Sequence, residues 1–134
     1  MKYYQLFINT VNSSETFNAI TNLLGLQPTE TEKDKLSEDR YSTWMYMVTE
    51  TEEDPYFDFI NCFLDVLEPK FAELEKIGVA KDNILFWLLY EYDQQCAMEF
   101  HPKEMIRLGQ SGINLNIDCW QLNIDEKSNN ITLG

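Results

Sequence analysis

Hydrophobic and polar residues alternate along residues 3–9, and this period of two predicts a β-strand. A helical pattern follows the strand. The sequence N-S-S-E, from Asn12 to Glu15, resembles a capping box, and apolar residues then recur at helical spacing. Gly25 is expected to end this helix, because glycine readily adopts the left-handed conformation found after a helix C-terminus.

Residues 29–40 contain charges of both signs and no periodic apolar residues, which favours an exposed, mobile loop. Residues 41–49 alternate again and predict a second strand. A helix is expected next, with Asp54 as its N-cap and Pro55 at its first position, where the missing N–H of proline costs nothing. Pro69 should interrupt this helix and divide it in two.

Residues 82–93 are apolar on both faces, which is typical of a central strand. Residues 96–100 predict a short strand that returns in a hairpin, and residues 101–112 predict a short helix. The side chains of that helix expected to face inward are Met105, Ile106 and Leu108. Residues 113–120, INLNIDCW, alternate strictly and predict the last strand.

This last strand has one apolar face and one polar face, and the polar face carries Asn114, Asn116, Asp118 and Trp120. Such a row suits a ligand site, a partner-binding strip or a solvated edge. No base, nucleophile or metal-ligand set elsewhere complements Asp118, so we interpret it as a structural carboxylate that accepts hydrogen bonds from a nearby loop or helix end. Trp120 is expected to pack over the edge of the sheet.

The order of these elements predicts an α+β fold, a single-domain sandwich in which helices pack on a largely antiparallel sheet. We expect this domain to span residues 1–122, and a chain of 134 residues is long enough to bury one hydrophobic core. Residues 123–134 show no packing pattern and are expected to form a disordered tail.

The formal net charge is −13, and residues 30–75 alone carry fourteen acidic residues against four basic ones. A carboxylate excess repels nucleic acid and anionic membranes, so neither is expected as a partner. It attracts a basic partner and speeds association with it. The alternative is that the acidity only keeps the protein soluble.

The longest apolar run, residues 84–90, is far shorter than the roughly 20 residues of a membrane span. The N-terminal segment alternates and lacks the continuous apolar core of a signal peptide. Cys62, Cys96 and Cys119 lie in apolar segments, where we expect buried, reduced thiols. These features predict a cytoplasmic protein.

Common catalytic arrangements are missing from the sequence. Its five glycines form neither G-x-G-x-x-G nor a P-loop, and G-x-S-x-G is absent. The single histidine, His101, precedes a proline at a helix start and is expected to be a capping or surface residue. The acids of residues 52–58 lack calcium-loop spacing, so no metal or cofactor is expected. Catalysis by two carboxylates remains an alternative, because carboxylates that are distant in the sequence can form a pair in the folded protein. We nevertheless expect a protein that is not an enzyme.

Several stretches together resemble an uncharacterised bacterial family of domains of unknown function, DUF4279. They are an L-L-G-L-x-P helix end at residues 23–28, a strand with a central Trp44, a leucine-ended helix with a proline nearby at residues 67–69, and the closing strand with Asp118 and Trp120. The resemblance covers residues 3–122, although the loop after Pro28 departs from the family's usual glycine-containing pattern. The family has no assigned activity, so the resemblance supports the fold.

The chain is also similar, in size, acidity and lack of catalytic motifs, to small immunity proteins of contact-dependent and other polymorphic toxin systems. That resemblance implies that carboxylates cover the active site or substrate groove of a basic toxin nuclease. Our leading hypothesis is an immunity or inhibitor protein that binds a basic partner through an acidic surface, with the loop at residues 30–39 as an extension. The expected partner-binding residues are Glu50, Glu52, Glu53, Asp54, Tyr56, Asp58 and Asp65.

The alternative hypothesis is a small-molecule-binding or regulatory module with a pocket on the sheet near Trp120. Asp118 and Trp44 are the other residues assigned to this alternative or to a structural role. Core packing is the favoured interpretation for Trp44 and Trp87, since both lie on predicted strands. Trp120 differs from them because it shares a face with Asp118.

Overall fold

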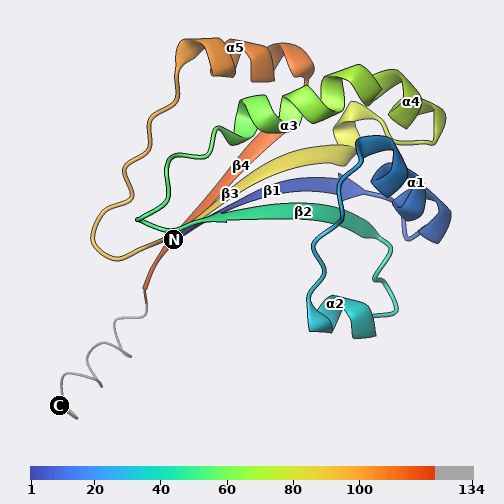
Figure 1. The fold of residues 1–134 in the computed structure, drawn as a ribbon, viewed down its shortest axis with the longest axis horizontal. Coiled ribbons are helices and arrows are strands. Elements are labelled where there is room, and N and C mark those ends of the chain that lie inside the picture. The colour runs from blue at the N-terminus through green and yellow to red at the C-terminus, as the bar shows by residue number, and fades with distance from the viewer. Residues whose placement is uncertain (123–134) are drawn as a thin grey trace.

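The strands form one sheet of four in the order β2-β1-β3-β4 (Figure 1). β1 pairs antiparallel with both β2 and β3, whereas β4 pairs parallel with β3. The computed structural model describes residues 1–122, so the tail predicted at residues 123–134 lies outside the described residues. The predicted α+β class with a largely antiparallel sheet is confirmed. The strands are β1 (Lys2–Asn9), β2 (Thr43–Glu50), β3 (Ile84–Tyr92) and β4 (Asn114–Gln121).

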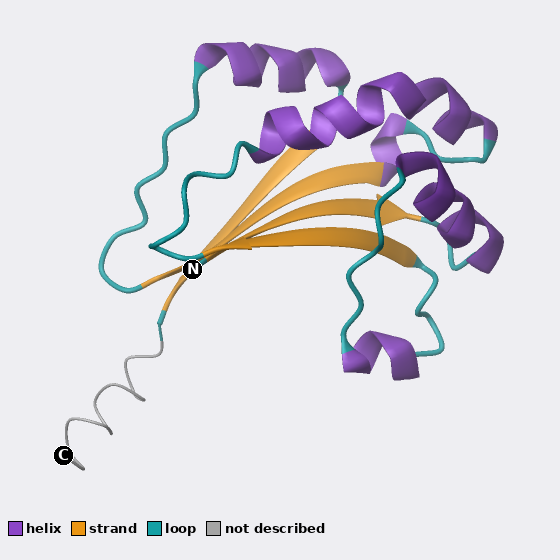
Figure 2. Cartoon of the chain, in the orientation of Figure 1, coloured by secondary structure: helices purple, strands orange, loops and turns teal. Residues whose placement is uncertain are grey.

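Helices α1, α3, α4 and α5 lie along one side of the sheet, and α2 lies apart from them (Figure 2). The 3-10 turn η1 separates α3 from α4 and contains Pro69, which confirms the predicted interruption. Within residues 1–122, no helix is long and apolar enough to cross a membrane. The helical elements are α1 (Ser14–Leu24), α2 (Glu32–Leu36), α3 (Phe59–Leu67), η1 (Glu68–Lys70), α4 (Phe71–Lys76), η2 (Lys81–Asn83) and α5 (Pro102–Ser111).

The hydrophobic core lies between the sheet and these helices. The strand register places Leu6 of β1 between Tyr46 of β2 and Phe86 of β3, so that alternate residues of all three strands face the helices. Trp44 is fully buried among them, and its indole N–H donates a hydrogen bond to Thr21 Oγ1 of α1 at 3.0 Å. The largest fully buried side chains include Trp44, Tyr4, Phe59, Phe63 and Phe86.

The opposite face of the sheet carries large apolar side chains, although α1, α3, α4 and α5 all lie on the other side (Figure 2). Trp87 alternates with the buried Phe86 and Leu88, so it lies on this uncovered face and is only half-buried. The prediction that Trp87 packs in the core is therefore wrong. β3 is apolar on both faces because the adjacent strands β1 and β4 partly cover the side chains on its uncovered face. The half-buried apolar residues of this face include Tyr3, Phe7, Met45, Met47, Leu85 and Leu89.

The start of α1 differs by one residue from the sequence prediction. The N-cap of α1 is Ser13 and not Asn12, and its side chain accepts a hydrogen bond from the Thr16 N–H at 3.3 Å.

The predicted loop at residues 29–40 contains the short helix α2, which a capping box between Thr31 and Asp34 stabilises. The apolar periodicity used for prediction misses a helix of this kind, because α2 buries no side chain.

The helix predicted to begin at Asp54 and Pro55 begins instead at Phe59, with Asp58 at the N-cap position. Asp54 closes a turn: its carboxylate accepts hydrogen bonds from the Thr51 N–H at 2.8 Å and the Thr51 hydroxyl at 3.0 Å. The segment up to residue 57 stays non-helical because it is tied back to the end of β2 through the Phe57 N–H.

Residues 96–100 form no strand, and the predicted hairpin return is wrong. Because β4 is parallel to β3, the chain must cross back along the helix layer, and α5 makes that crossing. The predicted inward face of α5 is also wrong for Met105 and Ile106, which are 55% and 59% exposed. The buried residues of α5 are Glu104, Leu108 and Ser111.

The cysteines are less buried than predicted. Cys62 and Cys96 are exposed and Cys119 is half-buried. Burial still raises the pKa of the Cys119 thiol, and the neighbouring Cys96 thiol adds to the rise.

Candidate functional site

The antiparallel pairing gathers three chain segments at one edge of the sheet. Lys2, at the start of β1, lies opposite Glu50 at the end of β2 and opposite Tyr90 near the end of β3. The segments that follow β2 and β3 therefore emerge side by side. Residues 51–58 and 93–101, which are far apart in sequence, meet here.

A groove of about 670 Å³ runs between these segments, and we call it the acidic groove. It is lined by tyrosines at the end of β3 and by carboxylates from both segments, which we call the rim carboxylates. The lining residues are Met1, Lys2, Glu50, Thr51, Glu52, Asp54, Tyr56, Tyr90, Glu91, Tyr92, Asp93, Gln94 and Gln95.

The rim carboxylates have little cationic compensation. Glu52 and its neighbour Glu53 are exposed and make no ion pair with residues 1–122. Hydrogen bonds from the Thr51 N–H and hydroxyl lower the pKa of Asp54, and this carboxylate is exposed. The lining holds two cationic groups, and both are engaged. The Lys2 Nζ lies 3.7 Å from Glu50 and 4.8 Å from the centre of the Tyr90 ring, and the N-terminal ammonium of Met1 donates to the Glu91 carbonyl at 2.7 Å.

Glu50 lines the groove, but its carboxylate is engaged within the fold. It is 8% exposed, and its Oε1 accepts a hydrogen bond from the Phe57 N–H at 2.6 Å. With Lys2 on its other oxygen, this carboxylate anchors the loop to the sheet. Sequence reasoning assigned it to partner binding, whereas the structure gives it a structural role.

Tyr56 and Asp58 lie on the helix side of the same edge. Tyr56 is 53% exposed, while partial burial and the charges of Glu104 and Asp58 raise its pKa to about 12. Asp58 accepts a hydrogen bond from the Asn61 amide at 2.9 Å through Oδ2, and its buried Oδ1 has no hydrogen-bond partner within residues 1–122. This part of the site therefore presents a phenol ring within a negative potential.

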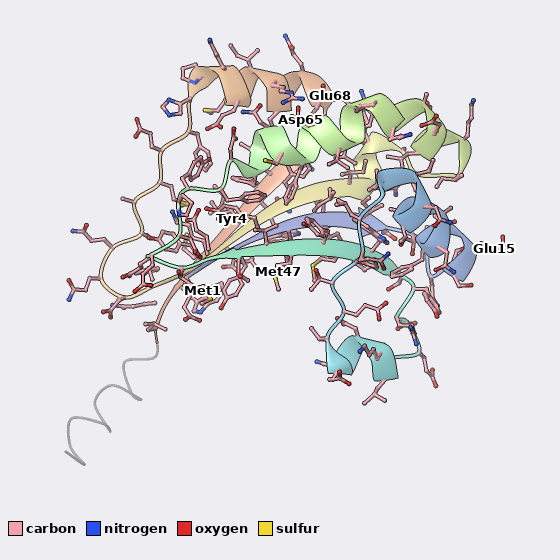
Figure 3. All side chains as sticks on the ribbon, viewed as in Figure 1. Met1, Tyr4, Glu15, Met47, Asp65 and Glu68 are labelled. Carbon is pink, nitrogen blue, oxygen red and sulfur yellow. The ribbon has the colours of Figure 1, made fainter. Side chains whose placement is uncertain are left out.

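Asp65 lies outside the groove. Its Oδ1 is 2.7 Å from Arg107 Nη2 of α5, and Glu68 binds the same guanidinium at 3.0 Å. Figure 3 shows Asp65 and Glu68 pointing from the α3 region towards α5. These carboxylates join two helices, so the expected role of Asp65 in partner binding has no geometric support.

The loop at residues 30–39 cannot extend the acidic groove. The loop precedes β2, whereas residues 51–58 follow β2. The two ends of this strand of eight residues lie about 25 Å apart. Two separate acidic regions therefore stand at opposite ends of β2. The structure adds Tyr90, Tyr92 and Glu91 to the groove, and strand adjacency is the only signal that could have linked them to residues 51–58.

A second, smaller cavity of about 240 Å³ adjoins the groove on the helix side, and we call it the aromatic pocket. Lys2 and Tyr56 border both spaces. The pocket lies between the start of α3 and the segment before α5, with His101 at its mouth. Its lining is otherwise mostly apolar: Tyr4, Phe59, Leu88, Ala97, Met98 and Phe100, with Glu99 beside them.

The Tyr4 hydroxyl is the unusual group of this pocket. The side chain is 1% exposed, and its buried hydroxyl lies beside the Glu50 carboxylate. Burial raises the pKa of Tyr4 well above its usual range, and the nearby Glu50 charge raises it further. The strand register places Tyr4 on the helix side of β1, where it packs in the core.

The polar face of β4 lies on the uncovered side of the sheet. Asp118 is exposed there and accepts no hydrogen bond within residues 1–122, so its expected role as a hydrogen-bonded structural carboxylate has no support in this part of the chain. Trp120 is 38% exposed and stacks on Tyr3, with ring centres 6.5 Å apart and planes at 7°. The cavities described for residues 1–122 are not lined by Asp118 or Trp120.

The site offers no evident metal chemistry in the part of the chain that the structure describes. No group of three or more His, Cys, Asp or Glu side chains there is placed to hold a metal ion. The side chain of His101 is exposed, while its backbone N–H donates to Glu104 at 2.9 Å at the start of α5. What the groove provides is fixed negative charge beside exposed aromatic surface.

Comparison with known proteins gives one match. No curated protein and no solved structure matches the chain. The model of a family described as a domain of unknown function, DUF4279, matches residues 3–122, which is almost the whole described chain. The chain belongs to the DUF4279 family.

Proposed function

We propose that this protein is a non-enzymatic, immunity-type inhibitor that binds a basic protein through the acidic groove. The partner we favour is a toxin nuclease domain, neutralised in the bacterial cytoplasm. The observation that carries the proposal is the groove itself: Glu52, Asp54 and Glu91 surround a tyrosine-lined space whose one lysine side chain is already paired.

Charge supports the approach of such a partner. A net charge of −13 produces a negative field around the whole molecule, and the groove concentrates carboxylates at one edge. Complementary fields of this kind steer diffusional encounter and speed association more than they strengthen the final complex. The same field repels nucleic acid, which suits a protein that competes with a nuclease substrate.

Tyrosines support the bound state. Tyr56 is 53% exposed beside carboxylates, and Tyr90 and Tyr92 line the groove. Tyrosine rings offer large, rigid contact surfaces and attract Lys and Arg side chains through cation–π interactions. We infer that Tyr56 anchors the centre of the interface, and that Glu52, Glu53 and Asp54 pair with basic residues around it.

The test is a double charge reversal, Glu52→Lys with Glu53→Lys, assayed against each basic protein encoded beside the gene. Because both carboxylates are exposed and unpaired, folding should be unchanged. We expect the association rate to fall by about tenfold or more, and protection of cells against the partner to be lost. Surface plasmon resonance and a co-expression growth assay measure the two effects.

A matched control is Glu15→Lys with Glu75→Lys, which changes the net charge equally but away from the groove. Figure 3 shows Glu15 at the opposite end of the molecule from Met1. Both control residues are exposed. If the control variant slows association as much as the groove variant does, the effect of charge is not specific to the groove and the proposed site is wrong. The function itself fails if none of these basic proteins binds.

A further inference from the structure

The two edges of the sheet differ, because the chain itself closes one of them. At the β2 edge, the Thr29 N–H donates to the Met45 carbonyl at 2.7 Å, and the Thr29 hydroxyl accepts from the Met47 N–H at 3.1 Å. At the β4 edge, no backbone hydrogen bond from residues 1–122 reaches the outer side of the strand (Figure 1). An open edge strand of eight residues is a template for pairing with another strand.

The backbone groups that β4 presents at this edge follow from its register. The Leu122 N–H, directly after β4, donates to the Tyr92 carbonyl at 2.8 Å, so the backbone of Leu122 faces β3. Successive residues of a strand direct their N–H and C=O groups to opposite sides, and the register of β3 with β4 is continuous. The residues of β4 whose backbone groups point outwards are therefore Leu115, Ile117, Cys119 and Gln121.

Exposed apolar side chains lie beside this edge on the helix side of the sheet. Ile117 is in register with the buried Leu88, so it lies on the helix side, yet it is 44% exposed. Met105, on the helix that leads into β4, is 55% exposed. It lies about 200° around α5 from Arg107, which faces α3, so Met105 is on the flank away from α3. A strand added to β4 buries Ile117.

Charge favours a second copy of this chain as the added strand. Two molecules of net charge −13 repel each other, so they can meet only through a surface with few charges. β4 carries one charged residue, Asp118, among its eight. Like charges directly opposite each other destabilise a strand pair, which excludes a two-fold axis at Asp118.

A two-fold axis at Ile117 gives a complementary register. In an antiparallel pair about this axis, Ile117 lies opposite its own copy, and Asp118 lies opposite Asn116 of the second copy. The outward backbone groups of Ile117 form the hydrogen-bonded pair, so Asp118 and Asn116 form the closer pair, with Cα atoms about 4.5 Å apart. At this distance the Asn116 amide can donate to the carboxylate, and the pair forms twice by symmetry.

We propose that two copies of this chain pair antiparallel through β4, about a two-fold axis at Ile117, and join their two sheets into one. The dimer assigns a role to the polar row of β4, because Asn116 and Asp118 set the register. Among residues 1–122, β4 contributes none to the lining of the acidic groove, so the proposal is independent of the proposed function.

Sedimentation equilibrium of the full chain tests the proposal. We expect a reversible dimer with a dissociation constant of about 10–100 µM, because the interface of one strand pair is small. Added salt should strengthen the dimer, since ions screen the repulsion between two chains of charge −13. Amide exchange measured by NMR should slow at Ile117 and Cys119 as the protein concentration rises.

An exchange of the two polar residues tests the register. Asn116→Asp sets two carboxylates opposite each other at both symmetric positions, so the dissociation constant should rise about tenfold. Asn116→Asp combined with Asp118→Asn restores one amide and one carboxylate to each pair at the native net charge. This double variant should return the constant to within about threefold of the native value.

Two further variants complete the experiment. Thr49→Asp, at an exposed position of β2, changes the net charge as Asn116→Asp does and should leave the dissociation constant within about twofold. Ile117→Pro removes an outward N–H that β3 does not use, so it should abolish the dimer in a folded chain.

The proposal is overturned if the native chain stays monomeric at millimolar concentration, or if the dimer slows amide exchange elsewhere than at β4. It is also overturned if the double variant stays as weak as Asn116→Asp, or if folded Ile117→Pro dimerises like the native chain. Should Ile117→Pro fail to fold, the exchanged pair decides.

Discussion

Glu50 shows how a residue type that suits binding can serve folding instead. In sequence it begins a run of acidic residues, yet in the structure it is buried, and the last position of β2 turns it towards the helices. Its carboxylate joins three parts of the chain, because it contacts Lys2 of β1 and the Phe57 N–H of the loop. Glu52, two residues later, is exposed and free of such contacts.

This contrast predicts different responses to the same substitution. Glu50→Ala leaves the Phe57 N–H and the Lys2 ammonium without their partner, so we expect the free energy of unfolding to fall by about 2 kcal/mol. Glu52→Ala should change it by less than about 0.5 kcal/mol. Urea denaturation measures both values. Equal effects of the two substitutions would show that Glu50 does not anchor the loop.

Tyr56 predicts a dependence of stability on alkaline pH. Its folded pKa, raised to about 12, lies above the value of about 10 for an unfolded tyrosine. The stabilisation is fully present below about pH 10 and is lost as the pH rises through 12, because the unfolded chain releases the proton first. Tyr56→Phe should therefore flatten the decline of the melting temperature between pH 10 and 12. Parallel declines for both proteins would refute this.

At the scale of elements, α5 is held by polar contacts more than by an apolar stripe. Arg107 donates to Glu68, to Asp65 and to the Asn61 side-chain oxygen at 2.8 Å, and its bonds to Glu68 and Asp65 raise the pKa of the guanidinium. Glu104 is buried on the inner face, whereas Met105 is exposed. Periodicity of apolar residues therefore gives the wrong inner face for this helix.

Removal of this clamp should loosen α5 selectively. We expect Arg107→Ala to lower the free energy of unfolding by about 1–2 kcal/mol, because a multidentate guanidinium network is stronger than an isolated surface pair. Lys103→Ala, at an exposed position of the same helix, is the control and should have almost no effect. Hydrogen exchange of the α5 amides reports the change. Unaltered exchange in the Arg107 variant would mean that the clamp contributes little.

Two glycines offer a second contrast at this scale. Gly25 ends α1 with a φ of 67°, a conformation that costs other residues about 1–2 kcal/mol, so Gly25→Ala should destabilise the protein by that amount. Gly109 lies inside α5 with no atom within 4 Å of an added Cβ, so Gly109→Ala should stabilise by about 0.5–1 kcal/mol. Thermal denaturation tests both, and shifts of the same sign would contradict the argument.

The sequence predicts elements well where local chemistry decides them. β1 and β3 follow from alternation and apolar content, and the end of α1 follows from Gly25. It fails where a distant contact decides. The start of α3 depends on Glu50 capturing the Phe57 N–H, and the crossover at residues 93–101 depends on β4 pairing parallel to β3.

The candidate site was predictable only in part for the same reason. Residues 51–56 stand out by charge, and the structure keeps Glu52, Glu53, Asp54 and Tyr56 in or beside one groove. Tyr90 and Glu91 join them through strand pairing, which composition does not encode. Asp65 shares the acidity of the group but faces another helix.

At the scale of the whole molecule, the charge predicts how binding should respond to salt. With a net charge of −13 and carboxylates gathered at the groove, the protein attracts a basic partner over distances at which dissolved ions screen the attraction. We expect the association rate to fall about tenfold or more between about 10 and 500 mM salt, while dissociation changes less. Stopped-flow mixing measures both rates. An association rate independent of salt would exclude electrostatic steering.

The central claim is that the acidic groove is the partner-binding surface, and the most direct measurement maps that surface in a complex. The protein is used to capture its partner from the native organism, and hydrogen–deuterium exchange is compared with and without it. We predict slowed exchange at residues 51–57 and 90–95, with the uncovered sheet face unchanged. Protection confined to that face or to α5, with the groove residues exchanging as before, would contradict the account.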